Sequence, residues 1–138
     1  MLDELKKLHD EIEGLLHDLD LLTQSEAPRL DAVASTRLRL TRASRRRTVL
    51  LDTKVYPAVL ESSTDAERRS VEKLRDEGRQ ALLTSVGHIG RWTIGDIEER
   101  WKDYQVASRE MQRSMVRRVK DERDTLYALL HRQVRHSG

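Results

Sequence analysis

Hydrophobic residues recur every three or four positions along most of the chain, which is the spacing of an amphipathic α-helix. The first stretch of this kind spans about residues 2–22 and has His9 among its apolar positions. Residues 25–28, with the sequence SEAP, predict a turn, and a second helix is expected over about residues 29–60. Pro57 falls inside or just before the last turn of that helix.

Two further helices are predicted in the second half of the chain. Thr64 and Glu67 have the Ser/Thr-x-x-Glu spacing of a capping box, so they predict the start of a third helix, which ends near Trp92. Asp96 is expected to cap the last long helix. The apolar stripe of the third helix is expected to contain Val71, Leu74, Leu82, Val86 and Ile89. Amphipathic helices joined by short connections indicate an all-α fold, an antiparallel up-down four-helix bundle.

The composition agrees with one helical domain. The chain has 138 residues with no Phe, 2 Pro and 6 Gly, so its core must come mainly from aliphatic side chains in helical stripes. This length is typical of a single domain, which we expect over residues 1–132. Residues 133–138 are expected to form a frayed C-terminal tail.

Several classes of protein are excluded by what the sequence lacks. It has no Cys, which excludes disulfides, thiolate metal sites and cysteine nucleophiles. No apolar run approaches the ~18 residues of a membrane span. The amino terminus, MLDELKKLHDEIEGLL, is amphipathic and lacks the apolar block of a signal peptide. We therefore expect a cytoplasmic protein with no membrane partner.

Positive charge is concentrated in one segment although the net charge is only +2. The segment RLRLTRASRRR, Arg37 to Arg47, contains six arginines. They spread around most of a helix with no aromatic residue between them, which disfavours a nucleic-acid partner. A solvated helix face is the favoured interpretation of this segment, and the alternative is a surface that binds another protein with acidic residues. The residues of this candidate interaction surface are Arg37, Arg39, Arg42, Arg45 and Arg46.

Polar residues that fall on the apolar stripes point into the bundle, because positions three or four apart share one face of a helix. They are His9, Arg47, Arg118 and Glu122. The other histidines, such as His88, lie off the stripes and are expected at the surface. In a four-helix bundle, inward polar groups at one level are the usual sites of carboxylate- and histidine-bridged iron.

Several motifs resemble those of the hemerythrin-like (HHE cation-binding) domain family, in its bacterial branch. They are LKKLHDEIEGLL at residues 5–16, VYPAVL at 55–60, RDEG at 75–78, GRW at 90–92 and DERDTLYALL at 121–130. The resemblance covers nearly the whole chain and implies a four-helix bundle that holds two iron ions. The family pattern has a histidine early in the first helix and a His-x-x-x-Glu motif before a Tyr-Pro in the second. A histidine or glutamate follows in the third helix, and a second His-x-x-x-Glu in the fourth.

The second helix departs from this pattern at both ligand positions. Arg47 stands nine residues before Tyr56, where the family has histidine. Leu51 stands five residues before Tyr56, where the family has the bridging glutamate. Tyr56 and Pro57 match the Tyr-Pro that ends this helix in the family.

The fourth helix keeps only one of its two ligand positions. Glu122 matches the glutamate, but Arg118 stands where the family has histidine. The resemblance therefore leaves His9, Glu122 and Glu77 as vestigial ligands. A guanidinium cannot lose its proton to bind a metal, so we expect no metal here.

The two arginines offer a physical substitute for the lost iron. We expect Arg47 and Arg118 to supply the positive charge, in buried pairs with Glu122, Glu77 or Asp121. Breaking one partner of such a pair typically costs about 3–5 kcal/mol.

An aromatic cluster is expected at the joint between the third and fourth helices, formed by Trp92, Trp101 and Tyr104. Capping the end of the bundle is the expected role. The alternative is a site where the rings stack on a small planar ligand or a partner protein.

These observations favour a non-enzymatic bundle that lost its diiron site and acts as a regulatory or protein-interaction module. The first alternative is an oxygen or redox sensor that binds iron through His9, Glu122 and Glu77. A second is phosphotransfer on His9, which requires that side chain to be exposed. The sequence contains no glycine-rich loop and no Ser/His/Asp arrangement that would indicate an enzyme. It does not decide whether the chain forms a homodimer.

Overall fold

The structure is a computed structural model that describes residues 1–137, with side chains through Gln133, and the all-α prediction is confirmed for that part. The long helices are α1 (Leu2–Thr23), α2 (Leu30–Leu50), α4 (Asp65–Arg91) and α6 (Trp101–Ser137). The short elements are a π-helical turn η1 (Leu51–Val55), α3 (Tyr56–Glu61) and α5 (Ile94–Glu99).

The C-terminal segment that was expected to fray contains the end of α6, which extends to Ser137. Side chains from residue 134 onward, and all of Gly138, lie outside the described part of the chain. Among the described residues, no helix combines the length and the apolar character needed to cross a membrane.

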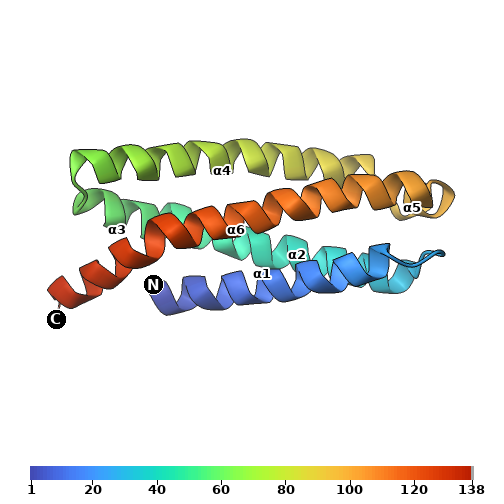
Figure 1. Ribbon diagram of the computed structural model, residues 1–138, viewed down its shortest axis with the longest axis horizontal. Helices are drawn as coiled ribbons and strands as arrows, with labels where there is room; N and C mark the ends of the chain where they lie inside the picture. Colours follow the sequence, from blue (N-terminus) through green and yellow to red (C-terminus); the bar gives the residue numbers. More distant parts are fainter. Residues whose placement is uncertain (138) are drawn as a thin grey trace.

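The long helices lie side by side along the long axis of the molecule (Figure 1). α1 packs against α2 and α6, and α4 packs against α6 and α3. α1 and α4 lie on opposite sides of α6, and both ends of the chain lie at the same end of the molecule (Figure 1). The interior between α1, α2 and α6 is therefore enclosed by segments distant in sequence.

Pro57 does not end the second helix, which continues to Glu61. Proline has no N–H to donate, so an unmodified α-helix would lose one hydrogen bond at this point. The backbone instead forms the π-helical turn η1, in which the N–H of Tyr56 donates to the carbonyl of Leu51. This turn carries the helix past Pro57, and Tyr56 is buried.

In the second half of the chain, α4 and α5 each begin directly after a threonine that caps the helix. Thr64 and Glu67 form the expected capping box at the start of α4. The prediction that Asp96 caps the last long helix is wrong. Thr93 caps α5 instead, and the Asp96 carboxylate accepts from the Thr93 hydroxyl at 2.8 Å. The Thr-x-x-Asp spacing makes a second capping box, so α6 begins only at Trp101.

The buried apolar residues form clusters at successive levels along the long axis. One is centred on Leu5, Val55 and Leu126, and the next on Ile12, Leu40 and Val119. His9 lies one helical turn from Leu5 and from Ile12 in α1, so the buried polar residues lie between these two clusters.

Two of the five residues predicted for the apolar stripe of the third helix are buried. Val71 and Leu74 are buried, but Leu82, Val86 and Ile89 are 44%, 60% and 41% exposed. These three side chains border an open groove that faces α2. The helical period places them on the same face as Val71 and Leu74, but in the second half of α4 that face borders the groove and its side chains stay exposed.

Candidate functional site

Glu122 of α6 is the centre of a buried polar cluster, the Glu122 network, formed with His9, Arg47 and Arg118. Its side chain is fully buried. Oε1 accepts a hydrogen bond from His9 Nε2 at 2.8 Å. Arg118 Nε lies 2.8 Å from Oε2, and Arg47 Nε lies 3.7 Å from Oε1. One carboxylate is thus shared by an imidazole from α1 and guanidinium groups from α2 and α6.

His9 is fully buried, so the prediction that it points inward is confirmed. An ionised carboxylate only accepts hydrogen bonds, so His9 Nε2 carries the proton that it donates to Glu122. Its Nδ1 lies 2.5 Å from the Tyr127 hydroxyl. The burial excludes His9 as an exposed phosphate acceptor and with it the phosphotransfer alternative.

Arg118 is held on several sides. Its Nη2 donates to the hydroxyl of Tyr56 at 3.1 Å, while its Nε faces Glu122. The guanidinium also lies against the backbone of α4 at Gly78. A Cβ placed on Gly78 would lie 2.9 Å from Arg118 Cζ and closer still to Nη2. The absence of a side chain at residue 78 therefore makes room for Arg118.

Tyr56 is the acceptor that helps to fix Arg118. Burial raises the pKa of its hydroxyl to about 12, although the charge of Arg118 acts in the opposite direction. The hydroxyl is therefore neutral at ordinary pH. The π-helical turn just before Tyr56 brings it to the same level as Glu122.

We expect Tyr56→Phe to lower the free energy of unfolding by about 1–3 kcal/mol, since it leaves a buried donor of Arg118 without an acceptor. Chemical denaturation of both proteins measures this difference. Tyr127→Phe is not a suitable control, because Tyr127 contacts His9. Arg69→Ala is suitable, because Arg69 is exposed on α4. Equal stability of Tyr56→Phe and the wild type would show that this hydrogen bond contributes nothing.

Glu122 is ionised in the folded protein. Burial by itself raises the pKa of this carboxyl, but the hydrogen bond from His9 and the charges of Arg47 and Arg118 outweigh it. The pKa therefore lies below its ordinary value of 4.5. A group with a lowered pKa stabilises the fold above the pKa it has when unfolded, and that contribution disappears as the pH falls through the folded value.

Acidification is therefore expected to destabilise the protein through Glu122 as the pH falls below about 4.5. Protonation would leave the guanidinium groups of Arg47 and Arg118 without their shared counter-charge. The free energy of unfolding measured from pH 7 to pH 3 should fall more steeply for the wild type than for Glu122→Gln, which has no carboxyl to titrate. Identical pH profiles would contradict the expectation.

The residues present do not fit the diiron centre that the resemblance implies. Glu77 is 50% exposed and pairs with Lys73 on the surface of α4, so it does not face Glu122. Leu51 is buried in an apolar cluster. In the part of the chain that the structure describes, no three His, Asp or Glu side chains are grouped to hold a metal ion. Of the acidic partners expected for the two arginines, Glu122 is the one that both contact, and Glu77 pairs with Lys73 instead.

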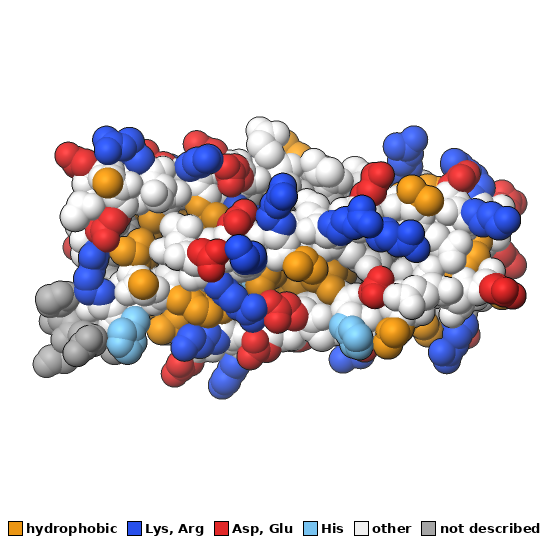
Figure 2. Space-filling model, viewed as in Figure 1, with side chains coloured by type: hydrophobic (Ala, Val, Ile, Leu, Met, Phe, Trp, Pro, Cys, Tyr) orange, Lys and Arg blue, Asp and Glu red, His pale blue; other side chains and the backbone are white. Residues whose placement is uncertain are grey.

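The arginine-rich segment presents most of its charge to solvent. Arg39, Arg42, Arg45 and Arg46 are exposed and border a shallow groove between α1 and α2. Arg46 pairs with Glu11 of α1 at 2.9 Å. Arg37 differs from these four, because it is half-buried with its guanidinium 5.8 Å from the ring centre of Tyr104. On the face seen in Figure 2, acidic and basic side chains are interspersed.

Trp92, Trp101 and Tyr104 are buried together at the end of the molecule where α4, α5 and α6 meet. The Trp101 ring stacks on Tyr104 with centres 5.8 Å apart, and Trp92 meets Tyr104 edge-on at 5.5 Å. Trp101 Nε1 donates to the carbonyl of Ser25 at 2.9 Å, which ties α6 to the turn after α1. This geometry favours the capping role, since the rings pack against one another.

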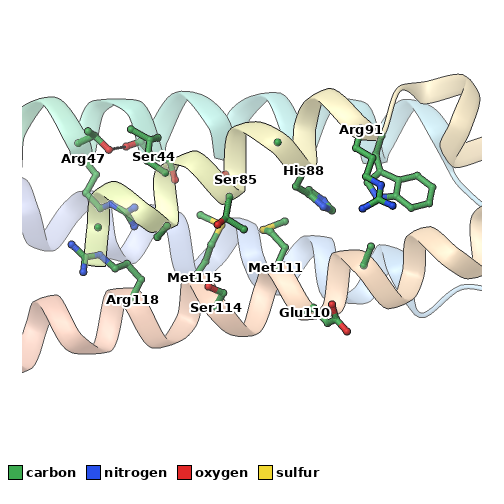
Figure 3. A pocket seen from close by; sticks show the side chains of 18 residues that line it. Ser44, Arg47, Ser85, His88, Arg91, Glu110, Met111, Ser114, Met115 and Arg118 are labelled. Atoms are coloured by element: carbon green, nitrogen blue, oxygen red, sulfur yellow. Dashed lines mark hydrogen bonds between the residues drawn. The ribbon is translucent and has the colours of Figure 1, made fainter. Parts of the chain in front are cut away.

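A cavity of about 530 Å³ lies beside the Glu122 network, between α2, α4 and α6. Arg47 and Arg118 border one end of it, and His88 and Arg91 border the other (Figure 3). His88 is half-buried rather than exposed, and burial, together with the charge of Arg37, lowers its pKa. The sequence analysis did not predict this cavity. The only signal for it was the presence of small residues along one face of α4, including Gly78, Ala81 and Ser85.

No protein-family model, no curated protein and no solved structure matches the chain. The function must therefore follow from the residues and their geometry.

Proposed function

We propose that the chain is a hemerythrin-like antiparallel four-helix bundle, of the bacterial kind, that has lost its diiron centre. It is a non-enzymatic, cytoplasmic protein that works as a regulatory or protein-interaction module. The observation that carries this proposal is the sharing of Glu122 by His9, Arg118 and Arg47.

The positions of these residues support the proposal. His9 and Glu122 stand where the motifs place metal ligands, and Arg47 and Arg118 stand where the motifs place histidines. The guanidinium groups supply positive charge beside the carboxylate that would otherwise bind the cation. Such an exchange keeps the carboxylate ionised and buried without a metal, because guanidinium and carboxylate groups form strong charge-assisted hydrogen bonds.

The metal content of the purified protein, expressed with iron supplied, tests the proposal. We expect elemental analysis to find less than stoichiometric iron and the visible spectrum to lack iron absorption. Stoichiometric iron in the folded wild-type protein would contradict the loss of the metal site and favour the sensor alternative. That alternative needs Glu77 as a ligand, and the exposed position of Glu77 does not favour it.

A reversion variant tests the ancestry separately. Arg47→His, Leu51→Glu and Arg118→His together restore the ligands that the second and fourth helices of the family would supply. We expect this variant to bind iron, since the unchanged His9 and Glu122 complete much of the ligand set. The same substitutions moved to exposed neighbours, Arg46→His, Asp52→Glu and Arg117→His, are the matched control. A folded reversion variant that binds no more iron than this control would count against a hemerythrin-like origin.

The interaction surface that we propose is the exposed arginine row on α2. Arg39, Arg42 and Arg45 lie beside Arg46 along the groove between α1 and α2, where an acidic segment of a partner protein would find several cations. The planar-ligand alternative at Trp92 and Trp101 is less favoured, because both rings are buried against Tyr104.

A further inference from the structure

The cavity beside the Glu122 network has the size and the lining of a small-molecule site. Its volume of about 530 Å³ falls within the usual range of roughly 300–1,000 Å³ for ligand pockets. Arg47 and Arg118 form its polar end, and Met111 and Met115 lie along its middle (Figure 3). Leu82 also lines the cavity. A polar end next to an apolar wall is the lining that an amphipathic ligand requires.

The polar end carries buried donors with no acceptor. Among the described residues, none accepts a hydrogen bond from Arg118 Nη1, from Arg47 Nη1 or from Arg47 Nε. The hydroxyl of Ser44, next to them on the cavity wall, is also buried and unpaired. Glu122 Oε2, which lies 2.8 Å from Arg118 Nε, also forms no hydrogen bond, so one unpaired acceptor lies beside these unpaired groups. Most buried polar groups in folded proteins have a partner, so the excess of unpaired donors at one end of a cavity indicates a further acceptor.

The charges at this end do not balance. Arg47 and Arg118 bring two positive charges to the Glu122 network, and Glu122 supplies one negative charge. Glu110 is the acidic residue among the described cavity-lining side chains, and it lies away from this end (Figure 3). An anion with a single charge would balance the surplus, whereas a metal cation would increase it.

The apolar wall extends beyond the cavity. Met111, Met115 and Leu82 also border the adjoining groove between α2 and α4, where Val86 and Ile89 are exposed. The apolar body of a ligand anchored at the arginines would cover these side chains. Methionine side chains adapt to the shape of such a body because they are unbranched and flexible.

The geometry points to a binding site for an amphipathic monocarboxylate of the fatty-acid type. Its carboxylate accepts hydrogen bonds from Nη1 of Arg47 and Nη1 of Arg118. Its hydrocarbon chain lies against Met111 and Met115 toward the α2–α4 groove. This site does not depend on a hemerythrin-like origin, because it follows from the unpaired donors, the charge surplus and the apolar wall.

Three eight-carbon probes with different head groups test the chemistry. The full-length protein is titrated by calorimetry with octanoate, 1-octanol and octylammonium at equal ionic strength. We expect octanoate to bind at least about tenfold more tightly than either of the others, since only its head group pairs with the arginines. No detectable binding of octanoate at millimolar concentration, or equal binding of 1-octanol, would overturn the inference.

A matched pair of arginine variants on adjacent positions tests the site. Arg47→Gln removes a charge at the cavity, where the side chain is 12% exposed, and Arg46→Gln removes the same charge from a neighbouring surface position of α2, where it is 59% exposed. We expect octanoate affinity to fall about tenfold or more in Arg47→Gln and to stay within about twofold in Arg46→Gln. Equal affinities of the two variants would overturn the assignment of Arg47.

A third variant tests the hydrocarbon end and leaves every arginine in place. Ser85→Leu on α4 adds a branched side chain to the wall shared by the cavity and the groove. We expect it to weaken octanoate binding at least about fivefold by occupying the path of the chain, with far-ultraviolet circular dichroism confirming that the variant is folded. Unchanged affinity in a folded Ser85→Leu protein would show that the chain does not lie there.

Discussion

Replacing Glu122 by alanine is expected to lower the free energy of unfolding by about 3–5 kcal/mol. The substitution leaves the guanidinium groups of Arg47 and Arg118 buried without their shared carboxylate, and it removes the acceptor for His9 Nε2. For a protein of 138 residues this loss corresponds to a decrease in melting temperature on the order of 10 °C or more. Thermal unfolding followed by circular dichroism measures the decrease.

Glu77→Ala is the matched control for this experiment. It removes the same side chain from an exposed position in α4, where the pair with Lys73 contributes little. We expect its free energy of unfolding to stay within about 0.5 kcal/mol of the wild type. If Glu122→Ala melted as the wild type does, Glu122 would contribute no more than a surface carboxylate, and the proposed replacement of the metal by arginine would lose its physical basis.

Replacing Gly78 by alanine is expected to lower the free energy of unfolding by about 1–3 kcal/mol, although alanine is the better helix former. The added Cβ would occupy the space of the Arg118 guanidinium. That group cannot move away freely, because Glu122 and Tyr56 hold it from other sides. Chemical denaturation of wild type and variant gives the difference directly.

Gly87→Ala is expected to change the free energy of unfolding in the opposite direction, in the same helix. A Cβ at Gly87 would meet no atom within 4 Å, so only the gain in helix propensity applies. We expect this variant to be more stable than the wild type by about 0.5–1 kcal/mol. If both glycine variants were stabilised, the close approach of Arg118 to α4 would be excluded.

The helices were largely predictable, since their boundaries depend on local signals. The period of apolar residues predicted α1, and the capping box at Thr64 predicted the start of α4. The π-helical turn was not predicted, because it depends on how the backbone accommodates Pro57 within a packed helix. Asp96 was assigned to the wrong helix, since the sequence does not show whether an aspartate acts as the cap or as the third residue after it.

The residues at the centre of the candidate site were partly predictable, because the helical period also shows which side chains face the interior. Helical phase alone placed His9, Arg118 and Glu122 in the interior, where the structure has them. Glu77 was expected in the interior only from the resemblance of RDEG to a family motif, and it lies at the surface. A shift of one residue in matching such a motif rotates a side chain by about 100° around the helix. The cavity was not predictable, since it arises where the second half of α4 faces α2 across a groove, and no periodicity encodes the distance between two helices.

The π-helical turn also affects how this chain should be aligned with any other. A turn from Leu51 to Val55 with wider hydrogen-bonded rings accommodates one residue more than an α-helical turn of the same length. Residues on either side of it are therefore out of phase by about 100° relative to an uninterrupted α-helix. A one-residue deletion within the turn would convert it to an α-helical turn and leave Arg47 and Tyr56 on the faces they have now. A relative with one residue fewer here would therefore align with a gap and still present the same face to its interior.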